Sequence, residues 1–173
     1  MGVEIQILDW LQNLRTPAGD AIMSVITSLG NAGIIWILLA VLLLIIPKTR
    51  KTGAVLTVAL VLDVIICNGI IKNAVARIRP YDVNPVVELL IHKPYDYSFP
   101  SGHTAASFAA MSALYFAEER HLWKPVLVLA VLIAFSRLYL YVHYPTDVLG
   151  GAVLGIICGY LANKIVEKLS AMK

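Results

Sequence analysis

Long apolar runs separated by short polar stretches dominate the chain. Five of these runs lie at residues 33–46, 53–71, 101–117, 122–142 and 145–166. A bilayer core about 30 Å thick takes about 20 helical residues to cross. Backbone in hydrocarbon must also satisfy its own hydrogen bonds, so the pattern predicts an all-α, polytopic membrane bundle of about five to six transmembrane helices. The run 33–46 is the shortest of the predicted spans.

The N-terminal region has a different pattern. Residues 3–14 mix apolar and polar positions in a way that fits an amphipathic helix, and Trp10 suits a membrane interface. Asp20 can cap a second helix over 21–29, which at about 1.5 Å per residue is too short to span. We therefore expect one domain over 1–173, with short or interfacial helices in 1–30, a bundle over 33–168 and a long loop at 72–100.

Composition supports the membrane class. The chain is 59% hydrophobic and 14% charged, whereas soluble domains have about 45–50% apolar and about 25% charged residues. The net charge of +3 comes from scattered basic residues, so we expect no nucleic-acid partner. Cys67 and Cys158 lie in apolar runs and are expected to be buried small hydrophobes.

Basic residues predict the topology. With five spans, three basic regions fall on one face, which the positive-inside rule makes cytoplasmic. The loop 72–100 and the turn at 142–145 then face outward. The basic residues are Lys48, Arg50, Lys51, Arg120, Lys124, Lys164, Lys168 and Lys173.

Three polar signatures stand at the outward ends of the apolar runs. They are Lys72-x6-Arg79-Pro80, Pro100-Ser101-Gly102-His103 and Ser136-Arg137-x5-His143-x3-Asp147. Ionisable groups beside hydrocarbon are costly and usually functional. Their arrival at one membrane face predicts a shared site.

The first two signatures fit an anion site. Lys72 and Arg79 repel each other unless an anion lies between them, and arginine suits phosphate. Ser101 can cap a helix whose N–H groups face an anion, and Gly102 allows close approach. His103 can donate a proton. Taken alone, the first could be two snorkelling cations, and the second an ordinary cap beside an interfacial histidine.

The third signature supplies a nucleophile. Arg137 follows an apolar run and calls for an anionic partner. Asp147 is close enough in sequence to fix one nitrogen of His143 and leave the other free to attack phosphorus. A cap made by the His143–Asp147 pair is the simpler alternative. No Asp/Glu cluster for two metals accompanies the set, so we expect no metal and cations in its place.

These three motifs resemble those of the type 2 phosphatidic acid phosphatase family, in its membrane lipid phosphatase branch. The resemblance covers residues 72–147 and implies a core like that of vanadium haloperoxidases and bacterial acid phosphatases. It implies that His143 forms a phosphohistidine, that Asp147 orients His143, and that His103 protonates the leaving group. It implies that phosphate is held by Lys72, Arg79, Arg137, Ser101 and Gly102, without a cofactor.

The expected function follows from this resemblance. We expect hydrolysis of a lipid phosphate at the outer face of the cell membrane, with undecaprenyl diphosphate as the first choice. Phosphatidylglycerophosphate and phosphatidic acid are close alternatives. A vanadate-dependent peroxidase and a non-catalytic membrane protein are more distant ones. The membrane lipid is the only partner expected, and the sequence indicates no oligomeric state.

Other positions carry further expectations. Asp63 lies nine residues before Lys72, which on an α-helix places it on nearly the opposite face, away from the phosphate. We expect it to be a packing residue. Gly151, Gly155 and Gly159 form a stripe that predicts close helix packing within the monomer. The apolar part of the loop 81–99 could contact either lipid or its own loop.

Overall fold

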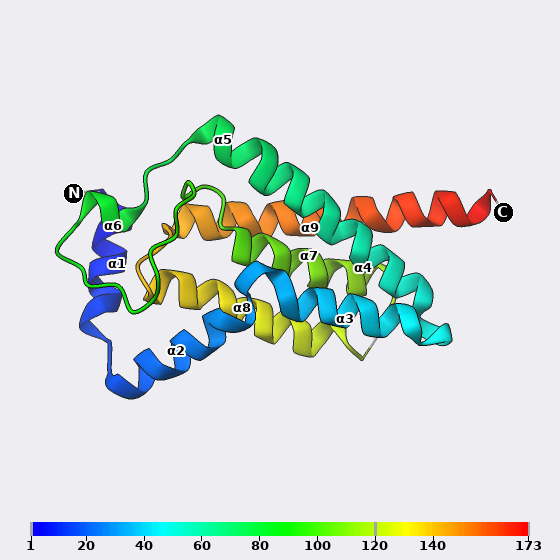
Figure 1. Ribbon diagram of the computed structural model, residues 1–173, viewed down its shortest axis with the longest axis horizontal. Helices are drawn as coiled ribbons and strands as arrows, with labels where there is room; N and C mark the ends of the chain where they lie inside the picture. Colours follow the sequence, from blue (N-terminus) through cyan, green and yellow to red (C-terminus); the bar gives the residue numbers. More distant parts are fainter. Residues whose placement is uncertain (1, 120, 173) are drawn as a thin grey trace.

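The computed structural model describes residues 2–119 and 121–172, and every regular element in this part is helical (Figure 1). The all-α prediction is confirmed. The elements are α1 (Val3–Asn13), α2 (Pro17–Leu29), η1 (Asn31–Gly33), α3 (Ile34–Ile45), η2 (Pro47–Thr49), α4 (Arg50–Asp63), η3 (Val64–Ile71), α5 (Lys72–Val75), α6 (Pro80–Val83), α7 (Gly102–Phe116), α8 (Trp123–Tyr139) and α9 (Pro145–Ala171).

Helix α7 forms the centre of the bundle, with α4, α8 and α9 around it (Figure 1). Its contact with α9 is close because glycines replace side chains there. A Cβ at Gly155 would lie 2.3 Å from the carbonyl oxygen of Ala105. At Gly159 it would lie 2.6 Å from the backbone nitrogen of Ala113. The glycine stripe therefore packs inside the monomer, as predicted.

Two helical stretches are long and apolar enough to cross a membrane, at Pro47–Val83 and Pro145–Ala171. A third candidate is the pair α2 and η1–α3, which meets the same test as one span bent by 42°. The break is at Gly30, and Ala32 and Gly33, which follow it closely, both have positive φ. Helix α2 is thus joined to α3, which extends the short run predicted at 33–46. The protein is a membrane protein, and its number of spans stays a prediction.

Helix α1 is amphipathic, as predicted. Ile5, Leu8 and Leu11 are buried, in one cluster with aromatic residues of the turn at 139–144, while Trp10 is exposed. Cys67 and Cys158 are buried free thiols, which confirms their assignment as core residues.

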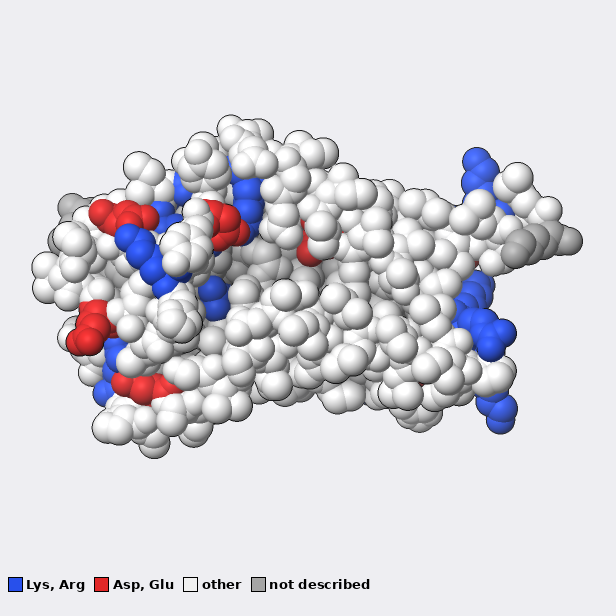
Figure 2. All heavy atoms as spheres, viewed as in Figure 1, with Lys and Arg blue, Asp and Glu red and all other residues white. Residues whose placement is uncertain are grey.

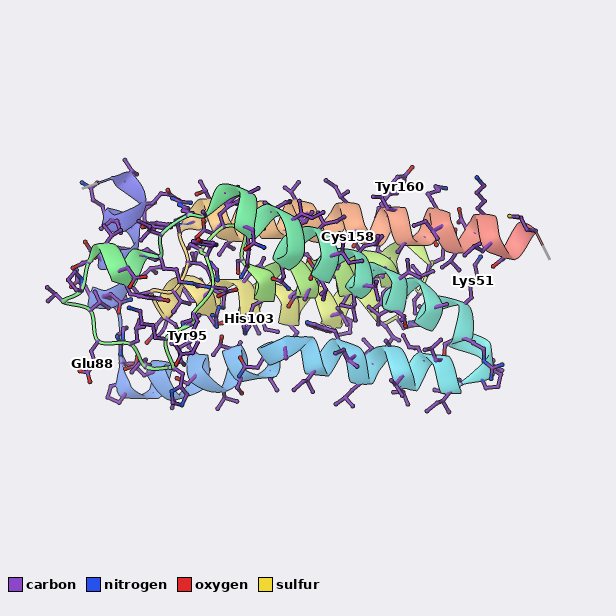
Figure 3. All side chains as sticks on the ribbon, turned by 45° about the horizontal axis from the view of Figure 1, so that its top comes forward. Lys51, Glu88, Tyr95, His103, Cys158 and Tyr160 are labelled. Atoms are coloured by element: carbon purple, nitrogen blue, oxygen red, sulfur yellow. The ribbon has the colours of Figure 1, made fainter. Side chains whose placement is uncertain are left out.

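The charged side chains gather at the two ends of the molecule. Figure 2 shows Lys and Arg without visible acidic residues at one end, and both signs at the other. Lys51 lies at the end opposite Glu88 (Figure 3). The predicted basic residues Arg120 and Lys173 lie outside the described residues. The broad band between the ends is almost free of visible charge, as a bilayer-embedded surface requires.

Candidate active site

The three signatures meet at one cavity of about 240 Å³. It lies at the end of the bundle that carries the long loop. Helix α5 supplies the first residue of the set, α7 begins at the second signature, and α8 ends at the third. The cavity is lined by Lys72, Arg79, Gly102, His103, Arg137 and His143. The sequence prediction of a shared location is thus met by these six residues.

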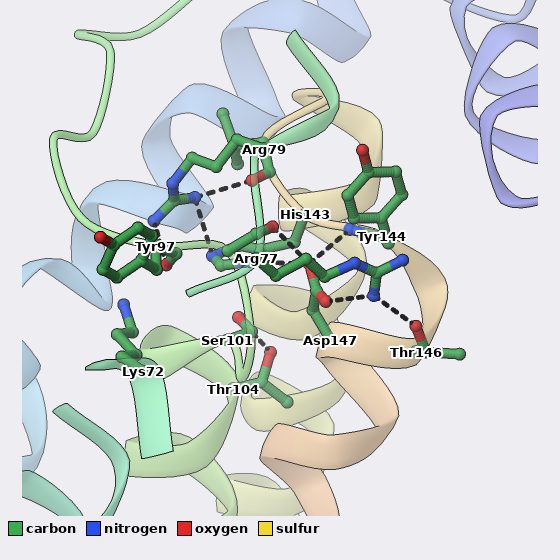
Figure 4. A network of polar contacts seen from close by, with 12 residues as sticks. Lys72, Arg77, Arg79, Tyr97, Ser101, Thr104, His143, Tyr144, Thr146 and Asp147 are labelled. Carbon is green, nitrogen blue, oxygen red and sulfur yellow. Dashed lines mark hydrogen bonds and ion pairs between the residues drawn. The ribbon is translucent and has the colours of Figure 1, made fainter. Parts of the chain in front are cut away.

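His143 lies in the turn between α8 and α9, beside Asp147 in the first turn of α9 (Figure 4). Its Nδ1 is 3.4 Å from Asp147 Oδ2, and its Nε2 is 3.2 Å from a guanidinium nitrogen of Arg79. Asp147 Oδ2 also accepts hydrogen bonds from Ser98 Oγ and the Tyr144 backbone N–H. A proton held on Nδ1 leaves the Nε2 lone pair unprotonated, where it accepts a hydrogen bond from Arg79.

Burial makes His143 a neutral base. The side chain is 2% exposed, and burial, together with the positive charges of Arg79 and Arg137, lowers the pKa of its imidazole to about 3 despite the opposing effect of Asp147. An imidazole with this pKa is unprotonated at neutral pH. It can therefore act as a nucleophile without first losing a proton.

Arg137 has an unused donor at the cavity. Its Nη1 donates to the Thr27 hydroxyl, whereas its buried Nε has no partner among the described residues. A buried guanidinium N–H without an acceptor is costly. An oxyanion in the cavity would satisfy it.

Asp96, in the long loop, occupies the anion position between the other two cations. Its carboxylate pairs with Lys72 Nζ, and its Oδ1 lies 2.5 Å from Arg79 Nη2. Burial raises the pKa of Asp96, but the hydrogen bonds and charges of Lys72 and Arg79 outweigh it and lower the pKa to about 2. Asp96 is thus charged at neutral pH and occupies the donors of both cations. Sequence reasoning missed this residue.

His103, in the first turn of α7, faces the same cavity. It lies deeper in the bundle than Tyr95 and Glu88 of the long loop (Figure 3). Its Nε2 is 3.0 Å from Asn31 Oδ1 at the bend between α2 and α3. This contact orients the ring. Sequence reasoning did not predict a role for Asn31 because it belongs to a different segment.

Ser101 and Gly102 differ in their relation to the cavity. Ser101 is the N-cap residue of α7, as expected, but its hydroxyl accepts a hydrogen bond from Thr104 and makes no cap bond. Ser101 is not among the residues that line the cavity, whereas Gly102 is. A Cβ at Gly102 would lie 3.8 Å from Lys72 Nζ. Its backbone is therefore close to the ammonium group of Lys72.

Arg77 is a second residue that sequence reasoning missed. Its Nη1 donates to Asp147 Oδ1 at 2.6 Å and to the Thr146 hydroxyl at 2.7 Å, and its Nη2 donates to Glu4 at 2.6 Å. The guanidinium also lies 3.8 Å from the centre of the Tyr144 ring. Arg77 thus holds Asp147 from the side opposite His143 (Figure 4).

Asp63 lies in the cavity wall, and the expectation that it faces away from the phosphate is wrong. The reason is η3, a π-helix of eight residues that separates Asp63 from Lys72. A π-helix bonds residue i to i+5 and holds more residues per turn than an α-helix. Nine residues then span nearly whole turns, so both side chains reach one side.

The charge at this site is supplied by side-chain cations. In residues 2–119 and 121–172, no group of three or more His, Cys, Asp or Glu side chains could hold a metal ion. The arrangement can bind an oxyanion, present a neutral imidazole nitrogen to it, and supply a second imidazole in the same cavity.

We expect Asp96→Asn to bind inorganic phosphate about tenfold more tightly. The amide carries no charge, so Lys72 and Arg79 are freed for the anion, and hydrogen bonds to charged groups are worth about 1.5–3 kcal/mol. Isothermal titration calorimetry of the detergent-solubilised protein at pH 7 measures the affinity.

The matched control is Asp82→Asn, which removes a carboxylate that pairs with Lys93 and with neither Lys72 nor Arg79. It should leave phosphate affinity unchanged. Equal effects of the two variants, or no effect of Asp96→Asn, would contradict the role given to Asp96.

Comparison with known proteins identifies the family. The model of the PAP2 superfamily matches residues 52–171. An undecaprenyl-diphosphatase of Sulfolobus acidocaldarius is 36% identical over 132 residues, which are 76% of this chain and 63% of that relative. Undecaprenyl-diphosphatase BcrC of Bacillus subtilis is 34% identical, with 87% of this chain and 76% of the relative covered.

Solved structures agree with this result. The crystal structure of Aquifex aeolicus LpxE superposes with a TM-score of 0.80 at 30% identity, over 95% of this chain and 96% of that one. A PAP2-type phosphatidylglycerolphosphate phosphatase from Bacillus subtilis superposes with a TM-score of 0.78 at 28% identity, over 95% and 85%. The chain therefore belongs to the PAP2 superfamily, in its branch of membrane lipid phosphatases.

Proposed function

We propose that the protein hydrolyses the phosphate of a membrane lipid through a phosphohistidine at His143. The observation that carries this proposal is the position of His143 Nε2 in a cavity with three cationic side chains, Lys72, Arg79 and Arg137. Cations fixed around a phosphoryl group stabilise the charge that develops during transfer.

In the first step, His143 Nε2 attacks phosphorus. The N–P bond forms as the bond from phosphorus to the leaving oxygen breaks, and His103 gives that oxygen a proton. In the second step, His103 takes a proton from water, whose oxygen attacks phosphorus. The N–P bond then breaks, and inorganic phosphate leaves. Asp147 stabilises the charge on the His143 ring throughout.

The site would work at the outer face of the cell membrane. This orientation follows from the basic end formed by the η2 region and the C-terminal part of α9, which the positive-inside rule makes cytoplasmic. The lipid tails would remain in the bilayer while the phosphate enters the cavity.

Undecaprenyl diphosphate is the first substrate to test. Relatives named for this activity include the Sulfolobus acidocaldarius and Bacillus subtilis proteins. Phosphatidylglycerophosphate is the second, because phosphatidylglycerophosphatase B of Bacillus subtilis is 31% identical over 92% of the chain. Phosphatidic acid completes the set.

The purified protein should release phosphate from at least one of these lipids in detergent with a chelator present. His143→Ala should lower the rate by at least about 10³-fold, because the nucleophile is lost. His121→Ala, at an exposed position far from the cavity in sequence, is the control. Loss of activity on adding chelator, or full activity of His143→Ala, would refute the mechanism.

Arg77→Met should lower kcat about tenfold and change KM little. Arg77 acts through Asp147 and does not line the cavity, so its loss disturbs the His143 ring and leaves the phosphate contacts intact. Arg77→Lys keeps a positive charge and should restore part of kcat. An increase in KM at constant kcat would show instead that Arg77 binds the substrate.

A further inference from the structure

Asp63 lines the cavity and carries a buried hydrogen-bond acceptor that has no partner within the described part of the chain. It ends α4 and is 2% exposed, and the acceptor is its Oδ1. It shares the cavity with His103, Arg137 and His143. A buried polar atom without a partner costs about 1–3 kcal/mol, and more when charged. An ionisable residue at membrane depth is a functional candidate for that reason.

The other acidic residues near the site are already used. Asp96 pairs with two cations, and Asp147 binds Arg77, Ser98 and His143. Asp63 makes no such pair, and the mechanism described above gives it no task. What its Oδ1 lacks is a donor, and Asp63 lines the cavity that is proposed to receive the substrate.

The surroundings of Asp63 place it below the phosphate. Its neighbours in the cavity wall are apolar, among them Ile37, Leu60 and Val64. Lys72 lies nine residues further along the helix, toward the long loop, and at about 1.5 Å per residue or less the axial separation is no more than about 14 Å. Asp63 therefore faces the part of a lipid that lies between its phosphate and its tails.

A metal ion is a poor occupant for this position. A cation such as Mg²⁺ or Ca²⁺ takes six or more oxygen ligands. Among the described residues that line the cavity, the carboxylates are Asp63 and Asp96, and Asp96 is already paired with Lys72 and Arg79. Three basic side chains in the same cavity also repel a metal ion. A neutral hydroxyl group meets neither obstacle, and it supplies one donor, as the Oδ1 atom requires.

We propose that Asp63 binds a hydroxyl group carried by the substrate between its phosphate and its tails. The proposal rests on the proposed function and extends it to lipids with a phosphorylated polyol. Phosphatidylglycerophosphate has such a hydroxyl on the glycerol next to its terminal phosphate. Undecaprenyl diphosphate has none, so Asp63 does not assist that substrate and distinguishes the two classes.

The test uses two lipids that differ in one hydroxyl. They are 1-oleoyl-sn-glycerol 3-phosphate and its 2-deoxy analogue, 3-oleoyloxypropyl phosphate, both presented in detergent micelles with chelator. The wild-type protein should show a kcat/KM about tenfold higher for the hydroxylated lipid, as expected for a hydrogen bond to a carboxylate. Asp63→Leu should bring this ratio close to one.

Two further variants complete the design. Asp63→Asn keeps an acceptor oxygen at the same position and should retain part of the preference. Thr57→Val lies on the same helix outside the cavity, where the threonine hydroxyl bonds its own helix at Gly53. It should keep the wild-type ratio, and thermal unfolding in detergent verifies that each variant is folded.

The outcomes separate the inference from the function on which it rests. Equal rates for the two lipids with wild-type protein, or an unchanged preference in Asp63→Leu and Asp63→Asn, would overturn the role of Asp63 while phosphatase activity stands. If the wild-type protein hydrolyses none of the four lipids, namely the two test lipids, undecaprenyl diphosphate and phosphatidylglycerophosphate, the proposed function itself is overturned.

Discussion

The main constraint on the site is the mutual repulsion of three buried cations, Lys72, Arg79 and Arg137, which the fold has to offset. Two like charges 4 Å apart repel by about 4 kcal/mol at an effective dielectric constant of about 20. The fold can hold them together because Asp96 supplies an anion and the Thr27 hydroxyl accepts from Arg137. The cavity thus favours a negatively charged group. The Asp96 carboxylate takes that place, and the substrate phosphate is proposed to displace it.

A second set of contacts orients His143, the proposed nucleophile. Glu4 binds Arg77, Arg77 binds Asp147, and Asp147 faces Nδ1 of His143. This series connects Glu4 in α1 with Asp147 in α9 and with His143 in the turn before it, so segments far apart in sequence share one polar network. This arrangement explains why an amphipathic helix at the N-terminus is packed over the end of the bundle that contains the site. The buried apolar face of α1 and the Glu4–Arg77 ion pair both hold α1 in this position.

The sequence predicted the helical bundle, the convergence of the motifs and the glycine contact between α7 and α9. It predicted these features because long apolar runs and motif spacing are local signals. The prediction for Asp63 was wrong because a π-helix changes the angle between successive side chains. No residue type in 64–71 indicates a π-helix from the sequence alone. It missed Asp96 and Arg77 because their partners come from other segments. Arg77 is visible in the sequence as an arginine between Lys72 and Arg79, but this position alone does not indicate its role.

The most direct test of the account is a structure of the protein with orthovanadate, an analogue of phosphate in transfer. The account predicts vanadium at bonding distance from His143 Nε2, oxygens in contact with Lys72, Arg79 and Arg137, and the Asp96 carboxylate displaced from the two cations. Vanadate bound away from His143, or Asp96 still bridging Lys72 and Arg79 with the ligand in place, would contradict it.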